Sequence, residues 1–112
     1  MEVNYELIKT LPDVTKAMND LLAFREGLKT NIIDQTVTSK VTGKVGEIRD
    51  ITKKQLFMNY ECRGSVPISL DKYSNIIETD KTTTKYIDEY LDTYEDERKL
   101  NLLRNKLTKA SK

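Results

Sequence analysis

The residues of this chain that could do chemistry are mainly carboxylates, and many of them gather near the C-terminus. The acidic segment holds Asp88, Glu89, Asp92, Glu95, Asp96 and Glu97. Carboxylate oxygens bind Ca²⁺ and Mg²⁺, but the register of a calcium loop is missing. Three interpretations are open: a solvated helix face that complements a helix N-terminus, a surface for a basic protein partner, or a metal site. We favour the first.

Missing residue types limit the remaining chemistry. The chain has no His and a single Cys, Cys62. These absences exclude a histidine-dependent triad, a cysteine-cluster zinc site and an intrachain disulfide. Acid–base chemistry by carboxylates alone stays open. The sequence therefore predicts a protein that is not an enzyme, with no catalytic residue, no metal and no cofactor.

A basic segment follows the acidic one. It holds Arg98, Lys99, Arg104, Lys106, Lys109 and Lys112, with no acid among them. One interpretation is a tail that binds nucleic acid or a membrane surface. The other is a helix C-terminus whose cations complement its own dipole, or pair with the acidic segment of the same or another copy. We favour the second, because Lys and Arg are common at helix ends.

Two candidate binding surfaces follow from these patterns. For a protein partner, the residues are Pro67, Tyr86, Tyr90, Tyr94, Asp92 and Glu95, although the three tyrosines form a stripe of the kind that packs on the barrel or on a second subunit. For nucleic acid, the alternative partner, they are Lys44, Arg49, Lys53, Lys54, Phe57 and Arg104. Small barrels stack bases on exposed aromatic side chains, and strand alternation leaves Phe57 outward whereas Tyr60 shares a face with Leu56 and Met58.

Helical elements are expected at the start of the chain. Apolar residues from Asp13 onward fall on one helical stripe: Val14, Ala17, Met18, Leu21, Phe24 and Leu28. Thr10 can cap this helix and Pro12 suits its first turn, while a shorter helix precedes it. Residues 1–30 are thus predicted to be a helical pair.

The middle of the chain alternates with a period of two and is rich in β-branched residues. It predicts five short strands at about 33–38, 40–49, 55–61, 65–70 and 75–78, with a helical turn before the last. Pro67 indicates that its strand has an exposed edge. This order is typical of SH3-like and Sm-like barrels, so we expect an α+β fold in which a small antiparallel barrel at 33–78 is flanked by N-terminal and C-terminal helices.

The last third is helical, with a change of phase. The stripe through Tyr86, Tyr90 and Tyr94 is rotated by roughly half a turn from the one through Leu100 and Leu107. We therefore predict a helical hairpin over 83–109, with helices at about 83–92 and 95–109. A continuous bent helix is the alternative.

Length and composition indicate one domain over residues 1–112. The hydrophobic fraction is 38%, the charged fraction 33% and the formal net charge +1. No apolar run approaches the ~18–20 residues that span a bilayer, and the first residues lack a secretory signal. We therefore expect a cytoplasmic protein without a membrane partner.

A homodimer fits helices with one wide apolar stripe. The excess of Lys over Arg is typical of AT-rich genomes of low-GC bacteria and their phages.

Two segments resemble known families. The stretch from Ile87 to Glu97, with Leu103 and Leu107, resembles the IDEAL domain of Firmicute proteins, with Tyr90 at the usual Ala and Tyr94 at the usual Gly. The barrel region is similar to the YolD-like family of small barrel proteins of Firmicutes and their phages. The matching segments are 41–45, 51, 54–56, 64–68 and 75–76. Neither resemblance implies a catalytic residue.

These observations predict a regulatory or adaptor protein, encoded by a phage or mobile element, that binds a host protein. It would do so through the strand edge near Pro67 or through the C-terminal helices. The alternative is a nucleic-acid-binding accessory protein that uses the basic barrel surface and the basic C-terminal helix.

Overall fold

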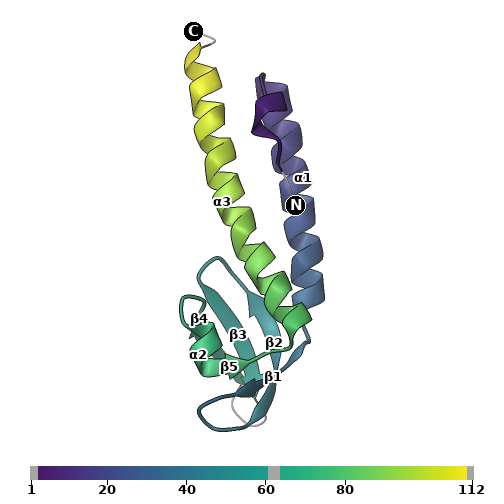
Figure 1. Cartoon of the computed structure of the whole chain (residues 1–112), viewed down its shortest axis with the longest axis vertical. Coiled ribbons are helices and arrows are strands. Elements are labelled where there is room, and N and C mark those ends of the chain that lie inside the picture. Colours follow the sequence, from purple (N-terminus) through teal and green to yellow (C-terminus); the bar gives the residue numbers. More distant parts are fainter. Residues whose placement is uncertain (1–2, 61–63, 111–112) are drawn as a thin grey trace.

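The computed structural model describes residues 3–60 and 64–110 and has an α+β fold. Its elements are η1 (Tyr5–Leu7), α1 (Leu11–Ile32), β1 (Thr36–Ser39), β2 (Val45–Ile51), β3 (Gln55–Tyr60), β4 (Gly64–Ser69), α2 (Tyr73–Ile76), β5 (Ile77–Glu78) and α3 (Lys81–Ala110). The helix α1 and the long α3 lie side by side and antiparallel, and their sheet-proximal ends cover the sheet (Figure 1). The molecule is elongated, with extents of 57 × 20 × 20 Å.

The N-terminal prediction is largely confirmed. The Thr10 hydroxyl accepts a hydrogen bond from the Asp13 backbone, the Asp13 carboxylate accepts one from the Thr10 backbone, and Pro12 lies in the first turn. This reciprocal cap satisfies donors that a helix start leaves unpaired. The shorter element before α1 is a single 3-10 turn, η1. It folds back so that Tyr5 donates a hydrogen bond to Asp96 of α3 over 2.7 Å.

The five strands form an open antiparallel sheet in the order β4-β3-β2-β1-β5. The predicted barrel closure is wrong for the described residues, because β4 and β5 are the two edges of the sheet. The two-residue β5 pairs only with β1, and α1 and α3 cover the apolar face that a closed barrel would bury inside itself. The second strand also starts later than predicted, since residues 40–44 form a turn in which Ser39 Oγ accepts hydrogen bonds from the Val41 and Thr42 backbones.

The main core lies between this sheet and the two helices. Alternate strand residues point into it, among them Ile48, Leu56, Met58 and Ile68, and α3 adds Ile87 and Tyr90. A second, smaller apolar cluster consists of Met18, Leu21 and Leu100 and lies farther along the helices, beyond the sheet. We call this outer part of the helix pair, α1 residues 11–22 with α3 residues 97–110, the arm (Figure 1).

The predicted helical hairpin over 83–109 is wrong, because α3 is one uninterrupted helix of 30 residues. Its buried stripe does not change phase: it runs through Thr83, Ile87, Tyr90, Thr93 and Leu100. The apparent break came from Thr93, a buried polar residue that occupies a core position. The Asp80 carboxylate begins the helix by accepting a hydrogen bond from the Thr83 backbone over 2.6 Å.

Two glycines provide a matched test of this fold. Gly27 lies within α1, and a methyl group there would meet no atom within 4 Å, so Gly27→Ala is expected to stabilise the protein by about 0.5–1 kcal/mol by removing backbone entropy. At Gly46 a Cβ would lie 2.7 Å from Tyr60 Cδ1 and 2.9 Å from the Asn59 carbonyl oxygen. Gly46→Ala is therefore expected to destabilise it by about 1–3 kcal/mol. Urea unfolding followed by circular dichroism measures both, and effects of the same sign would contradict the packing described.

Candidate functional site

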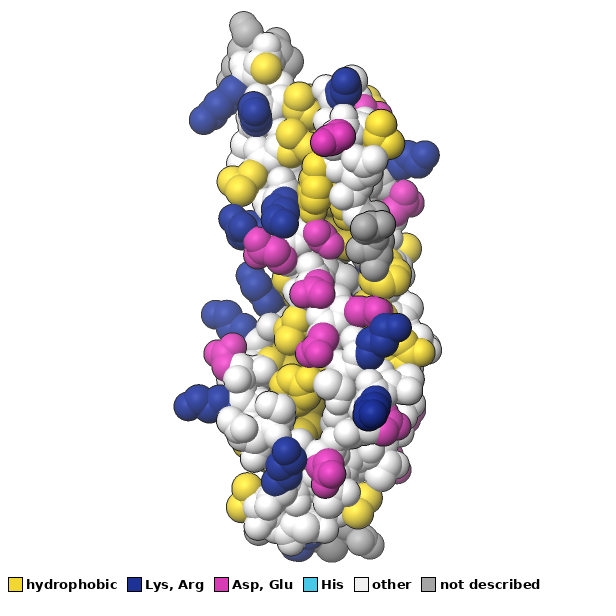
Figure 2. Space-filling model, in the orientation of Figure 1, with side chains coloured by type: hydrophobic (Ala, Val, Ile, Leu, Met, Phe, Trp, Pro, Cys, Tyr) yellow, Lys and Arg dark blue, Asp and Glu magenta, His cyan; other side chains and the backbone are white. Residues whose placement is uncertain are grey.

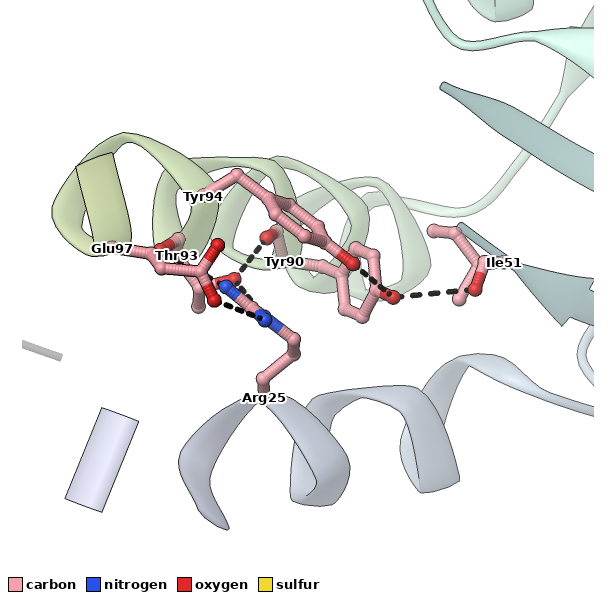
Figure 3. A network of polar contacts seen from close by, with 6 residues as sticks. All are labelled: Arg25, Ile51, Tyr90, Thr93, Tyr94 and Glu97. Atoms are coloured by element: carbon pink, nitrogen blue, oxygen red, sulfur yellow. Dashed lines mark hydrogen bonds and ion pairs between the residues drawn. The ribbon is translucent and has the colours of Figure 1, made fainter. Parts of the chain in front are cut away.

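The centre of the helix pair is a buried arginine on α1. Only 9% of Arg25 is exposed. Its Nε donates to Thr93 Oγ1 over 2.9 Å, its Nη2 donates to the Thr93 carbonyl over 3.3 Å, and its Nη1 pairs with Glu97 Oε1 at 3.1 Å (Figure 3). We call Arg25, Thr93 and Glu97 the arginine clamp. It separates the main core from the arm cluster and joins the midpoints of α1 and α3.

Two tyrosines extend the clamp to the sheet. The guanidinium carbon of Arg25 lies 3.9 Å from the centroid of the Tyr94 ring, within the range of a cation–π contact. Tyr90 donates its hydroxyl proton to the Ile51 carbonyl of β2 over 3.2 Å, so Tyr94 is the donor in the 2.9 Å bond between the two hydroxyls. The chain of contacts thus runs from α1 through α3 to β2 (Figure 3).

This network joins the two helices to each other and to the sheet. Among the described residues, no buried side-chain nitrogen or oxygen lacks a hydrogen-bond partner. Burial raises the pKa of the Tyr90 hydroxyl well above its usual value, with the hydrogen bond to Tyr94 adding to the effect, so this hydroxyl stays neutral. A buried polar contact of this kind fixes the register of two helices more than it adds stability.

Beside the clamp, the outer side of α3 carries a shallow groove of about 480 Å³, which we call the α3 groove. It is lined by Lys53, Leu91, Tyr94, Glu95, Glu97, Arg98, Asn101, Leu102 and Asn105. Leu102 is 56% exposed, which is high for a large apolar side chain. Glu95 and Arg98 form an exposed ion pair, and Arg98 lowers the pKa of the Glu95 carboxyl.

The predicted protein-binding residues separate into three groups. Tyr90 is buried and Tyr86 is half-buried against the main core, so these two stabilise the fold. Tyr94 and Glu95 line the α3 groove. Asp92 is exposed on α3 and Pro67 is exposed on β4, and neither lines the groove.

The edge position predicted for Pro67 is confirmed, because β4 is an edge strand. The Leu70 backbone N–H donates to the Lys54 carbonyl, so Leu70 and Lys54 form a hydrogen-bonded pair. Hydrogen-bonded and non-hydrogen-bonded pairs alternate along an antiparallel ladder, so Pro67 and Phe57 form a non-hydrogen-bonded pair. The nitrogen of Pro67 therefore faces the open edge, where it has no proton to donate. Such an edge is a poor template for an added strand.

The predicted nucleic-acid-binding residues are not brought into one patch. Lys44 lies before β2, whereas Lys53 and Lys54 lie after its other end, and Arg104 is half-buried on the arm. Arg49 pairs with Asp34 at 3.8 Å, and Phe57 is half-buried opposite Pro67. Acidic residues of the same strand, Glu47 and Asp50, lie between the basic ones.

The sequence-based prediction missed Arg25 and Leu102. Arg25 lies between Leu21 and Leu28 within the apolar stripe of α1, and a lone charge at a core position was the available signal. Leu102 lies outside the stripe through Leu100 and Leu107, so it had no predicted partner within the chain.

Comparison with protein-family models, curated proteins and solved structures finds no match to this chain, so the two family resemblances stay predictions.

Within residues 3–60 and 64–110, His, Cys, Asp and Glu side chains form no group of three that could hold a metal ion. Over the same residues, no helix combines the length and apolar character needed to cross a membrane.

The clamp predicts a specific stability loss. Arg25→Ala leaves the Glu97 carboxylate without its partner and removes the hydrogen bonds to Thr93, so the free energy of unfolding is expected to fall by about 2–4 kcal/mol. Glu97→Gln keeps an oxygen that accepts from Arg25 and is expected to cost less than about 1.5 kcal/mol. Urea unfolding of both variants measures the difference. Equal losses would show that the guanidinium does not hold the two helices as described.

Buried tyrosine hydroxyls predict instability at alkaline pH. Burial, aided by the nearby Asp88 carboxylate, raises the pKa of Tyr73 to about 12, while in the unfolded chain Tyr ionises near pH 10. Its stabilising contribution is therefore complete below about pH 10 and is lost as the pH rises toward 12. The ultraviolet absorbance of ionised Tyr and the helical circular dichroism signal are expected to change together over this range. In Tyr73→Phe the loss of stability should be smaller, and an unchanged profile would contradict this assignment.

Proposed function

We propose that this chain is a non-enzymatic protein-binding module, of the regulatory or adaptor kind, that binds its partner through the α3 groove. The observation that carries the proposal is Leu102, a large apolar side chain that is exposed in the same groove as the half-buried Leu91 and Tyr94. Along α3, the charged Glu95 and Arg98 lie between Leu91 and Leu102, so apolar and charged side chains alternate in the groove. Protein interfaces combine apolar contacts with polar and charged ones.

The position of the groove also supports binding. The groove lies along one long helix, and the arginine clamp holds its Tyr94 and Glu97 end against α1, so this end of the surface is ordered before a partner arrives. Preorganised surfaces lose less conformational entropy on binding than mobile loops do. A straight helical face of this kind suits a partner helix laid along it.

The carboxylates that could serve acid–base chemistry are already engaged in this region. Glu97 pairs with Arg25, Glu95 pairs with Arg98, and Asp96 accepts the hydroxyl proton of Tyr5. A general acid or base acts from within hydrogen-bond reach of the proton that it transfers, so each of these carboxylates would first have to exchange its present partner. This arrangement supports a binding role over a catalytic one.

Leu102→Asp tests this proposal against a matched control, Val41→Asp. Both residues are exposed apolar side chains, at 56% and 78%, but Val41 lies in the turn between β1 and β2. The full-length chain is immobilised and proteins captured from an extract of its source cells are quantified by mass spectrometry. We expect Leu102→Asp to reduce capture of the partner by about tenfold or more, as for an interface hot spot, and Val41→Asp to leave it unchanged. No captured protein, where further copies of this chain count as captured, or equal capture by both variants, would overturn the proposal.

A further inference from the structure

We infer that the partner of the α3 groove is a second copy of this chain, bound with the two α3 helices antiparallel. This inference rests on the proposed function and names the occupant of the same surface. It is carried by the order of side chains along the solvent-facing side of α3.

That side of α3 carries a row of mostly polar side chains, which we call the seam. The seam, which includes part of the groove, runs through Thr84, Asp88, Leu91, Glu95, Arg98, Leu102, Asn105 and Lys109. Intervals of four and three residues alternate along it, so it repeats every 3.5 residues and stays on one face of the helix. The buried stripe through Thr83, Tyr90, Thr93 and Leu100 faces the other way, toward the sheet and α1. Within the seam, Leu91 is half-buried against the main core and Asp88 accepts a hydrogen bond from Tyr73, so the apolar side chain that the fold leaves exposed is Leu102.

In one antiparallel register, each leucine lies against a leucine and each charged residue lies against a residue of opposite charge. It sets Leu91 against Leu102 of the second copy and, in the same alignment, Glu95 against Arg98 of the second copy. A two-fold axis repeats each contact, so the interface holds two leucine pairs and two ion pairs. Self-complementarity of this kind is what a symmetric dimer requires.

The charge distribution along α3 favours the same arrangement. On the face shown in Figure 2, acidic side chains lie mainly over the middle of the molecule, and basic ones lie on both sides and at both ends. In sequence, Lys81 and Lys85 begin α3, the acids occupy 88–97 and the remaining bases lie at 98–109. Antiparallel pairing lays the 88–97 segment of each helix against the 98–109 segment of the other, whereas parallel pairing would set like charges together. Asp92 and Lys99 lie beside the seam, and in this alignment Asp92 of one copy lies near Lys99 of the other.

The existing contact between Glu95 and Arg98 does not oppose this exchange. Their side chains are 53% and 60% exposed, and exposed pairs of this kind add little stability. Replacing the Glu95–Arg98 contact within one chain by the same contact between two chains therefore costs little free energy. Burial of Leu102, together with Leu91, supplies the apolar area that the exposed ion pair lacks.

Charge reversal at these two positions tests the inference. Glu95→Arg and Arg98→Glu each create like-charged pairs across the two-fold axis, while the double variant E95R/R98E restores opposite pairs in reversed order. Sedimentation equilibrium at low salt should give the wild type twice the 13.0 kDa chain mass. Each single variant should dissociate at least about fivefold more readily, and the double variant should match the wild type within about twofold. An equal mixture of the two single variants should form a heterodimer, because one seam is then basic and the other acidic.

Lys16→Glu reverses an exposed charge on α1 away from the seam and should leave the mass unchanged. A wild type that stays monomeric up to about 1 mM, or a double variant that fails to recover, would overturn the inference. If the wild type is monomeric while Leu102→Asp still removes a captured protein, self-association is wrong and the proposed function stands. If capture fails as well, both are wrong.

Discussion

The fold depends on how the chain accommodates one cation inside a helix pair. Arg25 cannot lose its proton, so its burial requires acceptors at fixed positions on the facing helix. Thr93 and Glu97 provide them, and Tyr94 covers the face of the guanidinium. Hydrogen bonds are more directional than apolar contacts, so this contact favours the observed alignment of α1 against α3. That alignment decides which face of α3 is turned outward.

Much of the architecture could be predicted from local sequence because it follows from short-range rules. The cap at Thr10, the alternation of Leu56 and Met58, and the exposed edge at Pro67 each involve neighbours within a few residues. Closure of the sheet could not be predicted this way, because it depends on whether distant edges meet. The hairpin prediction failed at Thr93 for a related reason: its core position becomes intelligible only with Arg25, which lies 68 residues away.

The candidate site was predicted only in part. Acidic and basic segments of α3 are visible in the sequence, and so is the exposure of Glu95. The side on which Leu102 falls is not, because it requires the phase of the whole buried stripe, and that stripe is interrupted by polar residues. Tyr86 and Tyr90 look like surface recognition residues by type, but packing against the sheet turns them inward. Which side chains line the groove thus depends on the rotation of α3 about its axis more than on the residue types.

Division of the interior by the clamp also has a dynamic consequence. The arm is held by a cluster of three fully or nearly buried apolar residues, Met18, Leu21 and Leu100, whereas the main core is several times larger. Local opening is least costly where few apolar contacts must be broken, so the arm can fray while the sheet end stays folded. Amide protection should therefore decline along α3 from the sheet toward its C-terminal end. Part of the seam lies on the arm, so a chain bound there would also reduce the fraying of α3.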